Sequence, residues 1–106
     1  MENSLIKRLY EEFPLVRVEL KDNTANVKEL EVRVDAYLIV LSYSVYARVL
    51  SVAATYEHPA YDEAETPDCT LESFKVYKDG ELTDLEPDDS QTTLIEVILT
   101  RNTIIE

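Results

Sequence analysis

Apolar residues near the start of the chain recur at three- and four-residue spacing, whereas the following segments alternate apolar and polar residues. Across residues 2–13 the spacing places the apolar side chains on one face, which predicts a short amphipathic helix packed on a sheet. Asn3 or Ser4 is expected to cap this helix, and Pro14 is expected to end it. The expected buried stripe consists of Leu5, Ile6, Leu9, Tyr10 and Phe13.

Two segments after the helix alternate regularly between apolar and charged residues. In residues 15–21 and 29–36 every second side chain is apolar, which is the pattern of a strand with one buried face. The run 22–26 between them is rich in turn-forming residues, so an antiparallel hairpin is predicted. Opposed charges across its outer face would each stabilise it by roughly a few tenths of a kcal/mol.

Residues 37–56 carry large apolar side chains at odd and even positions alike. Their β-branched and aromatic residues favour one long strand, although a helix over residues 43–56, capped by Ser42, also fits the spacing. A strand with large side chains on both faces is expected to be covered on both. The N-terminal helix would cover one face, and a second subunit is one way to cover the other.

The second half of the chain begins with an acidic segment, residues 57–68, which is expected to be a loop. Residues 69–77 return to the strand pattern, with Phe74 and Val76 facing inward. Asp79-Gly80 then predicts a tight hairpin turn, followed by a short return strand that contains Leu82 and Leu85.

The C-terminal segment fits two secondary structures. After Pro87, the run 88–90 resembles a helix start. Helical spacing is then followed by Leu94, Val97, Ile98, Arg101 and Ile104 or Ile105. Dense β-branching over residues 92–105 argues for a strand instead, and the helix is favoured narrowly. The sequence therefore predicts one α+β domain over residues 1–106: an N-terminal helix on a mostly antiparallel sheet of about five strands, with a C-terminal helix.

Charge is distributed very unevenly along the chain. The 106 residues carry a formal net charge of −12, and twelve acids between Glu57 and Asp89 are opposed only by Lys75 and Lys78. This sign argues against direct binding to nucleic acid or to an anionic membrane, because phosphate contacts need clustered bases. The acidic half is expected to bind a basic partner instead.

The residues that build common catalytic or metal sites are scarce. One glycine excludes a phosphate-binding loop, and His58, the only histidine, has no nucleophile tied to it by a motif. Four acids from Asp62 to Asp68 miss the calcium-loop spacing, and zinc would need more than one cysteine and one histidine. We expect no enzyme, cofactor or metal, and a small enzyme built around His58 is the least favoured alternative.

Cys69 and the apolar segments bear on the location of the protein in the cell. A single cysteine forms no internal disulfide, and Cys69 is expected to be a small buried strand residue. The start of the chain lacks a signal-peptide pattern, and the most apolar stretch, residues 36–41, is too short to span a bilayer. The expected location is the cytoplasm of a bacterial host.

The acidic segment suggests a mode of binding. Carboxylates two residues apart on a strand lie about 7 Å apart, which approaches the phosphate spacing along a nucleic acid strand. The resulting hypothesis is an inhibitor that mimics nucleic acid in the basic groove of a host DNA- or RNA-handling protein. Its candidate partner-binding residues are Tyr56, Tyr61, Asp62, Glu63, Glu65, Asp68, Glu72, Glu81, Asp84, Asp88 and Asp89.

Two other interpretations of the sequence stay open. Acidic surface segments are usually just solvated, and negative charge promotes solubility without any partner. The leading functional alternative is a structural or assembly module, such as a virion or chaperone component, which oligomerises through the Tyr- and Val-rich strand of residues 37–56. A homodimer is compatible with that alternative.

Three short runs in the second half resemble segments of small uncharacterised proteins that tailed phages encode. The runs are Ala54-Thr55-Tyr56-Glu57-His58-Pro59-Ala60-Tyr61, Val76-Tyr77-Lys78-Asp79-Gly80 and Leu82-Thr83-Asp84-Leu85. The opening helix and hairpin, followed by an acidic region, are also similar to small anti-CRISPR and other phage host-takeover proteins, several of which act as DNA mimics. The resemblance implies a phage origin and assigns no functional residues.

Overall fold

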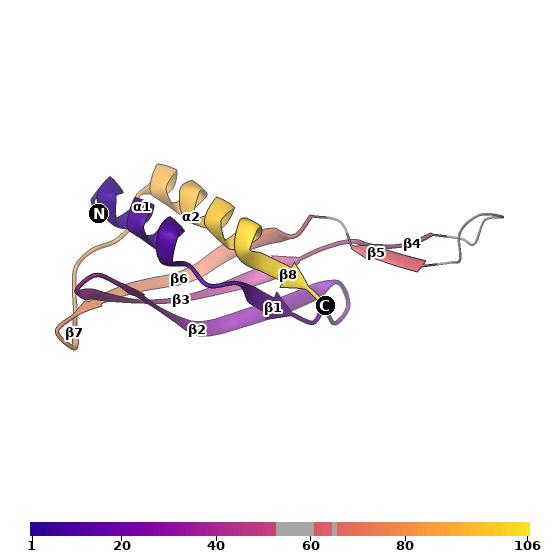
Figure 1. Cartoon of the computed structure of the whole chain (residues 1–106), viewed down its shortest axis with the longest axis horizontal. Helices are drawn as coiled ribbons and strands as arrows, with labels where there is room; N and C mark the ends of the chain where they lie inside the picture. The colour runs from indigo at the N-terminus through magenta and orange to yellow at the C-terminus, as the bar shows by residue number, and fades with distance from the viewer. Residues whose placement is uncertain (53–60, 65) are drawn as a thin grey trace.

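The computed structural model describes residues 1–52, 61–64 and 66–106, with side chains described for residues 1–48 and 66–106. Two helices and eight strands follow one another along these parts of the chain (Figure 1). In chain order they are α1 (Asn3–Glu12), β1 (Val16–Val18), β2 (Thr24–Val34), β3 (Tyr37–Tyr46), β4 (Val49–Val52), β5 (Tyr61–Ala64), β6 (Asp68–Lys78), β7 (Glu81–Leu82), α2 (Asp89–Asn102) and β8 (Thr103–Ile105).

The strands form one main sheet and two small pairs. The main sheet is antiparallel with the order β2-β3-β6-β7, while β1 pairs with β8 in parallel and β4 pairs with β5 as an antiparallel hairpin. The β4–β5 hairpin extends from one end of the molecule, whose principal extents are 59 × 22 × 22 Å (Figure 1). The predicted α+β fold, with a helix near each end of the chain, is confirmed.

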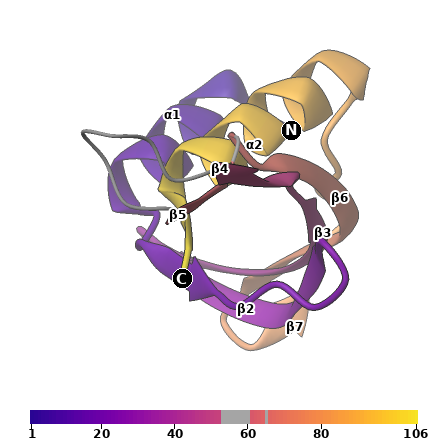
Figure 2. The same cartoon turned by 90° about the vertical axis from the view of Figure 1, so that its right-hand side faces the viewer.

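Both helices lie on the same side of the curved main sheet (Figure 2). The core fills the space between the helices and the sheet. Its largest fully buried side chains come from α1, α2 and the central strand β3. Helix α1 contacts β2, whereas α2 contacts β6. These side chains include Leu9, Ile39, Leu41, Tyr43, Ile95 and Leu99.

Helix α1 confirms the expected amphipathic helix with two differences in detail. The stripe of Leu5, Ile6, Leu9 and Phe13 is buried, but the side chain of Tyr10 is 48% exposed and stacks with the guanidinium of Arg101 at 5.5 Å. The predicted cap was wrong, because the N-cap residue is Glu2 and Asn3 and Ser4 are already helical. No side chain bonds to the first turn at this N-cap.

The predicted hairpin between residues 15–21 and 29–36 is not formed. A single bridge joins Lys21 to Thr24, while β1 pairs with β8 and β2 pairs with β3 over almost its whole length. The β2–β3 turn lies at Asp35, which adopts the left-handed conformation with φ of 53°. Ten residues of β3 offer β2 more hydrogen bonds and apolar contacts than three residues of β1, so the longer pairing prevails.

Residues 37–52 are extended and not helical, as the strand interpretation held, but the predicted single strand is divided at Ala47 and Arg48 into β3 and β4, which belong to different sheets. Residues 53–56 lie outside the described part. The acidic segment 57–68 was wrongly assigned entirely to a loop, because β5 pairs with β4 and β6 begins at Asp68. The apolar run of β4 gives this segment a strand to pair with.

The C-terminal predictions are largely confirmed. Asp79 and Gly80 form the β6–β7 turn with φ of 52° and 81°, and β6 is a strand with Val76 buried. Strand β7 ends at Leu82, so Leu85 is not part of the predicted return strand. Helix α2 ends at Asn102, where the short strand β8 follows.

The buried face of α2 differs from the predicted one. Ile95, Ile98 and Leu99 face the core, whereas the side chains of Leu94 and Val97 are 51% and 49% exposed. The prediction was wrong about these two because Leu94 and Val97 fit the helical spacing as well as the core residues do.

Candidate interaction surface

The main sheet has a second face, opposite the helices, which no described element covers (Figure 2). Successive side chains of a strand point to opposite faces. Because Ile39, Leu41, Tyr43 and Val45 of β3 are buried in the core, the intervening side chains point to the other side. We call this side the open sheet face; along β3 it is formed by Leu38, Val40, Ser42, Ser44 and Tyr46.

Strand register places charged and aromatic neighbours beside these β3 residues. Leu38 lies between Arg33 of β2 and Tyr77 of β6. Val40 lies between Glu31 and Lys75. The open sheet face therefore has an apolar centre with acids and bases on both sides.

Apolar side chains make up much of this face. Leu38, Val40 and Tyr77 are half-buried although they are not packed against the core cluster. Tyr46 and Leu82 are 52% and 59% exposed. An apolar strip on the central strand of a sheet is more typical of a covered face than of a face in water.

The open sheet face is hollowed at one end. A hollow of about 530 Å³ lies over Leu38 and Val40, between the β2 side and the β6–β7 turn. Its β2 wall carries two acids and one base, and its other wall carries an aromatic ring and the turn backbone. The wall residues are Glu29, Glu31 and Arg33 on one side and Tyr77, Asp79 and Gly80 on the other.

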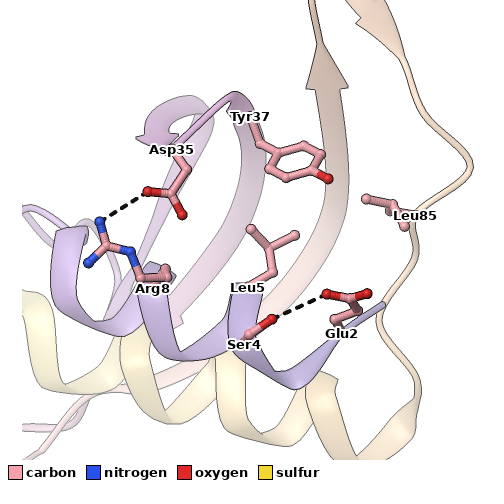
Figure 3. Close-up of a pocket in the computed structure, with 7 residues that line it drawn as sticks. All are labelled: Glu2, Ser4, Leu5, Arg8, Asp35, Tyr37 and Leu85. Atoms are coloured by element: carbon pink, nitrogen blue, oxygen red, sulfur yellow. Dashed lines mark hydrogen bonds and ion pairs between the residues drawn. The ribbon is translucent and has the colours of Figure 1, made fainter.

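A smaller hollow of about 300 Å³ lies between α1 and the β2–β3 turn (Figure 3). Arg8 donates to Asp35 at 3.2 Å and to Glu11 at 2.7 Å, and it lies 3.4 Å from Glu12. The hydrogen bonds that Arg8 donates to Asp35 and Glu11 raise its pKa. Because three carboxylates already surround this guanidinium, the hollow offers little attraction to an anionic ligand.

The acids singled out in the sequence are separated into groups. Asp62 and Glu63 lie in β5 and Asp68 begins β6, at the hairpin end of the molecule. Ten residues further along β6, or about 33 Å, a second group surrounds β7 and the start of α2. That group is Glu81, Asp84, Asp88 and Asp89, while Glu72 lies part-way along β6. The acids of this set that the structure describes therefore do not form one cluster.

The described members of this set are exposed, and Asp88 has a structural role. None of the four ion pairs found among the described side chains includes Asp68, Glu72, Glu81, Asp84, Asp88 or Asp89. Asp88 is the N-cap of α2, accepting a hydrogen bond from the backbone N–H of Gln91 at 2.8 Å. Tyr56, Glu65 and His58 lie outside the described residues, and of Tyr61 only the backbone is described.

The buried polar groups are satisfied by one another. Cys69 is buried in β6, as predicted, where desolvation raises the pKa of its thiol. Its Sγ and the Tyr43 hydroxyl lie 3.8 and 3.0 Å from Oγ1 of Thr103. In the described portion of the chain, no group of three histidine, cysteine, aspartate or glutamate side chains is arranged to hold a metal ion.

Sequence reasoning missed the charged residues of the open sheet face. Glu31 and Arg33 were interpreted only as the polar half of an alternating strand, and Lys75 only as one of two bases among the acids. The face itself was expected from β3, which is apolar at Leu38 and Val40 where alternation calls for polar residues. The charged residues beside it depend on strand register, which the sequence pattern does not define.

Comparison with protein-family models, with curated proteins and with solved structures gives no match to this chain. Among the described residues, neither helix has the length and apolar character needed to cross a bilayer.

Proposed function

We propose that this protein is a non-enzymatic interaction module that assembles through its open sheet face. The observation that carries the proposal is the apolar strip of Leu38 and Val40 on the central strand, with the exposed Leu82 and Tyr46 on the same face. A protein partner would cover this strip as the helices cover the other face.

The size of the face agrees with such a role. Ten residues of β3 span about 33 Å, and three strands span about 14 Å, so the projected area is on the order of 500 Å². Accessible area exceeds projected area, and a standard interface buries about 800 Å² per partner. Aromatic residues and arginine, which this face carries as Tyr46, Tyr77 and Arg33, are also enriched at protein interfaces.

Leu38→Glu tests this proposal. A carboxylate at the floor of the hollow would be desolvated without a partner, so assembly should weaken by at least about tenfold. The measurement is the size distribution of the tagged protein, purified and in bacterial lysate, by gel filtration and sedimentation. Leu94→Glu, which changes an exposed leucine on the helix layer, is the control for the added charge.

Both variants should retain the urea unfolding transition of the parent protein, because neither leucine belongs to the core cluster. Unchanged assembly of a folded Leu38→Glu variant, both purified and in lysate, would contradict a role for this face.

A nucleic-acid mimic is the second candidate function. It is favoured by the exposure of the acids around β7 and α2, none of which is in an ion pair with another described side chain. A local acidic group of this kind would bind a basic groove by replacing phosphates at one part of the site. Asp88 contributes to the group but also caps α2, so it is unsuited to a binding test.

The nucleic-acid mimic is tested by whether the purified protein displaces a labelled DNA duplex from each of three bacterial enzymes: a polymerase, a topoisomerase and a nuclease. The triple variant Glu81→Gln, Asp84→Asn and Asp89→Asn should displace the duplex at least about tenfold less well, since three charge contacts are lost. A control triple variant neutralises Glu19, Asp22 and Glu106, which are equally exposed but lie elsewhere. Equal displacement by both variants, or none by the parent protein, would exclude this function.

A further inference from the structure

The occupant of the open sheet face can be deduced from the spacing of two features on β3. Resting on the proposed function, we infer that the occupant is a second copy of this chain, related by a two-fold axis that crosses β3 at Ser42. In this dimer Tyr46 of each copy enters the hollow over Leu38 of the other.

The first argument is geometric. Tyr46 and Leu38 lie on the same face of β3, four residues on either side of Ser42. A two-fold axis through Ser42, perpendicular to the strand and in the plane between the sheets, exchanges the positions of residues 38 and 46. An exposed aromatic side chain at one end of the strand therefore meets the hollow at the other end, twice in each dimer.

The second argument concerns the centre of the face. On β3 and on its neighbour β6 the outward side chains near the axis are small, namely Ser42 and Ser44 of β3 and Ser73, which pairs with Ser42 from β6. On the β2 side the bulge places the longer side chains of Lys28 and Glu29 beside Ser42. Small residues let two sheets approach to about 10 Å, the usual distance between packed sheets. The larger side chains toward both ends, Tyr46 and Tyr77, then fill the space away from the axis.

The third argument is polar complementarity, which follows from the strand register. Tyr46 pairs with Asp68 of β6, just as Leu38 pairs with Tyr77. The axis places β6 of one copy over β6 of the other, and the two strands run in opposite directions. The phenol of Tyr77 in one copy therefore meets the carboxylate of Asp68 in the other. On β2 the same operation places Glu31 over Asn26 rather than over another acid.

The other simple dimer, with its axis along β3, fits less well. It would place Leu38 over Leu38 and Tyr46 over Tyr46. Two hollows would then face each other and leave a void over Leu38, while two exposed phenols would compete for one space. The axis across Ser42 avoids both problems.

The first experiment measures self-association of the purified chain by sedimentation between about 1 and 200 µM, a range suited to a small interface. The parent protein should dimerise, and Tyr46→Ala should raise the dissociation constant at least about tenfold. Tyr10→Ala removes a tyrosine of similar exposure from the helix layer and should leave the dissociation constant unchanged.

The second experiment distinguishes the two axes by cross-linking with a short bifunctional maleimide in a Cys69→Ala background. A mixture of Leu38→Cys and Tyr46→Cys proteins should cross-link, Ser42→Cys should cross-link to itself, and Leu38→Cys alone should not. Efficient self-cross-linking of Leu38→Cys would overturn the proposed axis in favour of the one along β3.

A parent protein that stays monomeric at 200 µM would overturn the second copy as occupant. The proposed function would survive that result if Leu38→Glu still removed the protein from a larger complex in lysate, and it would fail if Leu38→Glu changed nothing there.

Discussion

At the residue scale, Thr103 is the centre of the buried polar contacts. Its hydroxyl donates to the backbone carbonyl of Leu99 at 2.6 Å, so it accepts from the Tyr43 hydroxyl at 3.0 Å and from the Cys69 thiol at 3.8 Å. These contacts join α2, β3 and β6 through groups that are each buried. Burial costs little here because every donor has an acceptor.

This arrangement predicts loss of stability at alkaline pH. Burial raises the pKa of Tyr43 and the pKa of Cys69 above their ordinary values. The unfolded chain therefore loses these protons at lower pH than the folded protein does. Below the ordinary pKa values of tyrosine and cysteine, protonated Tyr43 and Cys69 make their full contribution to the free energy of unfolding. This contribution is lost as the pH rises from the ordinary pKa values toward the raised values of the folded protein.

Urea unfolding between about pH 8 and pH 10.5 measures the effect. The double variant Tyr43→Phe and Cys69→Ala should start about 1–3 kcal/mol less stable at pH 7, from two lost hydrogen bonds to Thr103 and reduced packing, but should lose less stability with rising pH. Tyr10→Phe is the control for removal of a surface phenol. Parallel pH profiles for the parent and the double variant would show that burial of Tyr43 and Cys69 does not cause the loss of stability at alkaline pH.

The sequence predicted part of this site. A buried Cys69 could be predicted from its place in an alternating strand, and the structure confirms it. The partner of Tyr43 could not, because Thr103 lies sixty positions away and becomes a neighbour only when α2 packs on the sheet. Local patterns carry no information about such contacts.

At the element scale, periodicity predicted the type of most elements but not their pairing partners. Strand 29–36 was recognised from its alternation, yet the structure pairs it with β3 instead of the segment before it. Alternation defines a buried face, and any strand with a complementary face can satisfy it. The parallel pair β1–β8 joins residues near opposite ends of the chain, so no turn motif in the sequence indicates this pairing.

Helix α2 shows how an N-terminal capping motif can outweigh the β-strand propensity of the residues that follow it. Residues 92–105 are rich in β-branched side chains, which favour strands, but Asp88 and Gln91 form a capping box at the start of the helix. Gln91 is also held by the backbone carbonyl of Met1 and by Asn3. The helix gives way to a strand at Thr103, where the β-branched preference finally prevails.

The same helix protects an edge of the main sheet. Strand β7 pairs only with the last residues of β6, so most of the outer edge of β6 lacks a strand partner. Glu96 of α2 accepts a hydrogen bond from the backbone N–H of Leu71 on that edge at 2.9 Å. This contact leaves one fewer free donor for a foreign strand, and it favours association through the open sheet face over association through the edge.

At the scale of the whole molecule, the charge asymmetry along the sequence becomes a separation in space. The acids from Glu57 to Asp89 were contiguous in the chain, but the length of β6 places Asp68 and Glu81 toward opposite ends. The sequence could not predict this division, because a strand and a loop separate acids by very different distances. The bases Arg33 and Lys75 both lie on the open sheet face instead, on opposite sides of β3.

Salt concentration therefore separates the two functions by the sign of its effect. Two copies that each carry a net charge of −12 repel one another, and the Debye length falls from about 30 Å at 0.01 M to about 8 Å at 0.15 M. Self-association through an apolar centre should become several-fold tighter over this range, because screening reduces the repulsion and leaves apolar contacts intact. Binding of a mimic to a basic groove should weaken instead. Sedimentation at both salt concentrations measures the first effect. A dimer that dissociates as salt increases would mean that ion pairs, and not Leu38, Val40 and Tyr46, hold the two copies together.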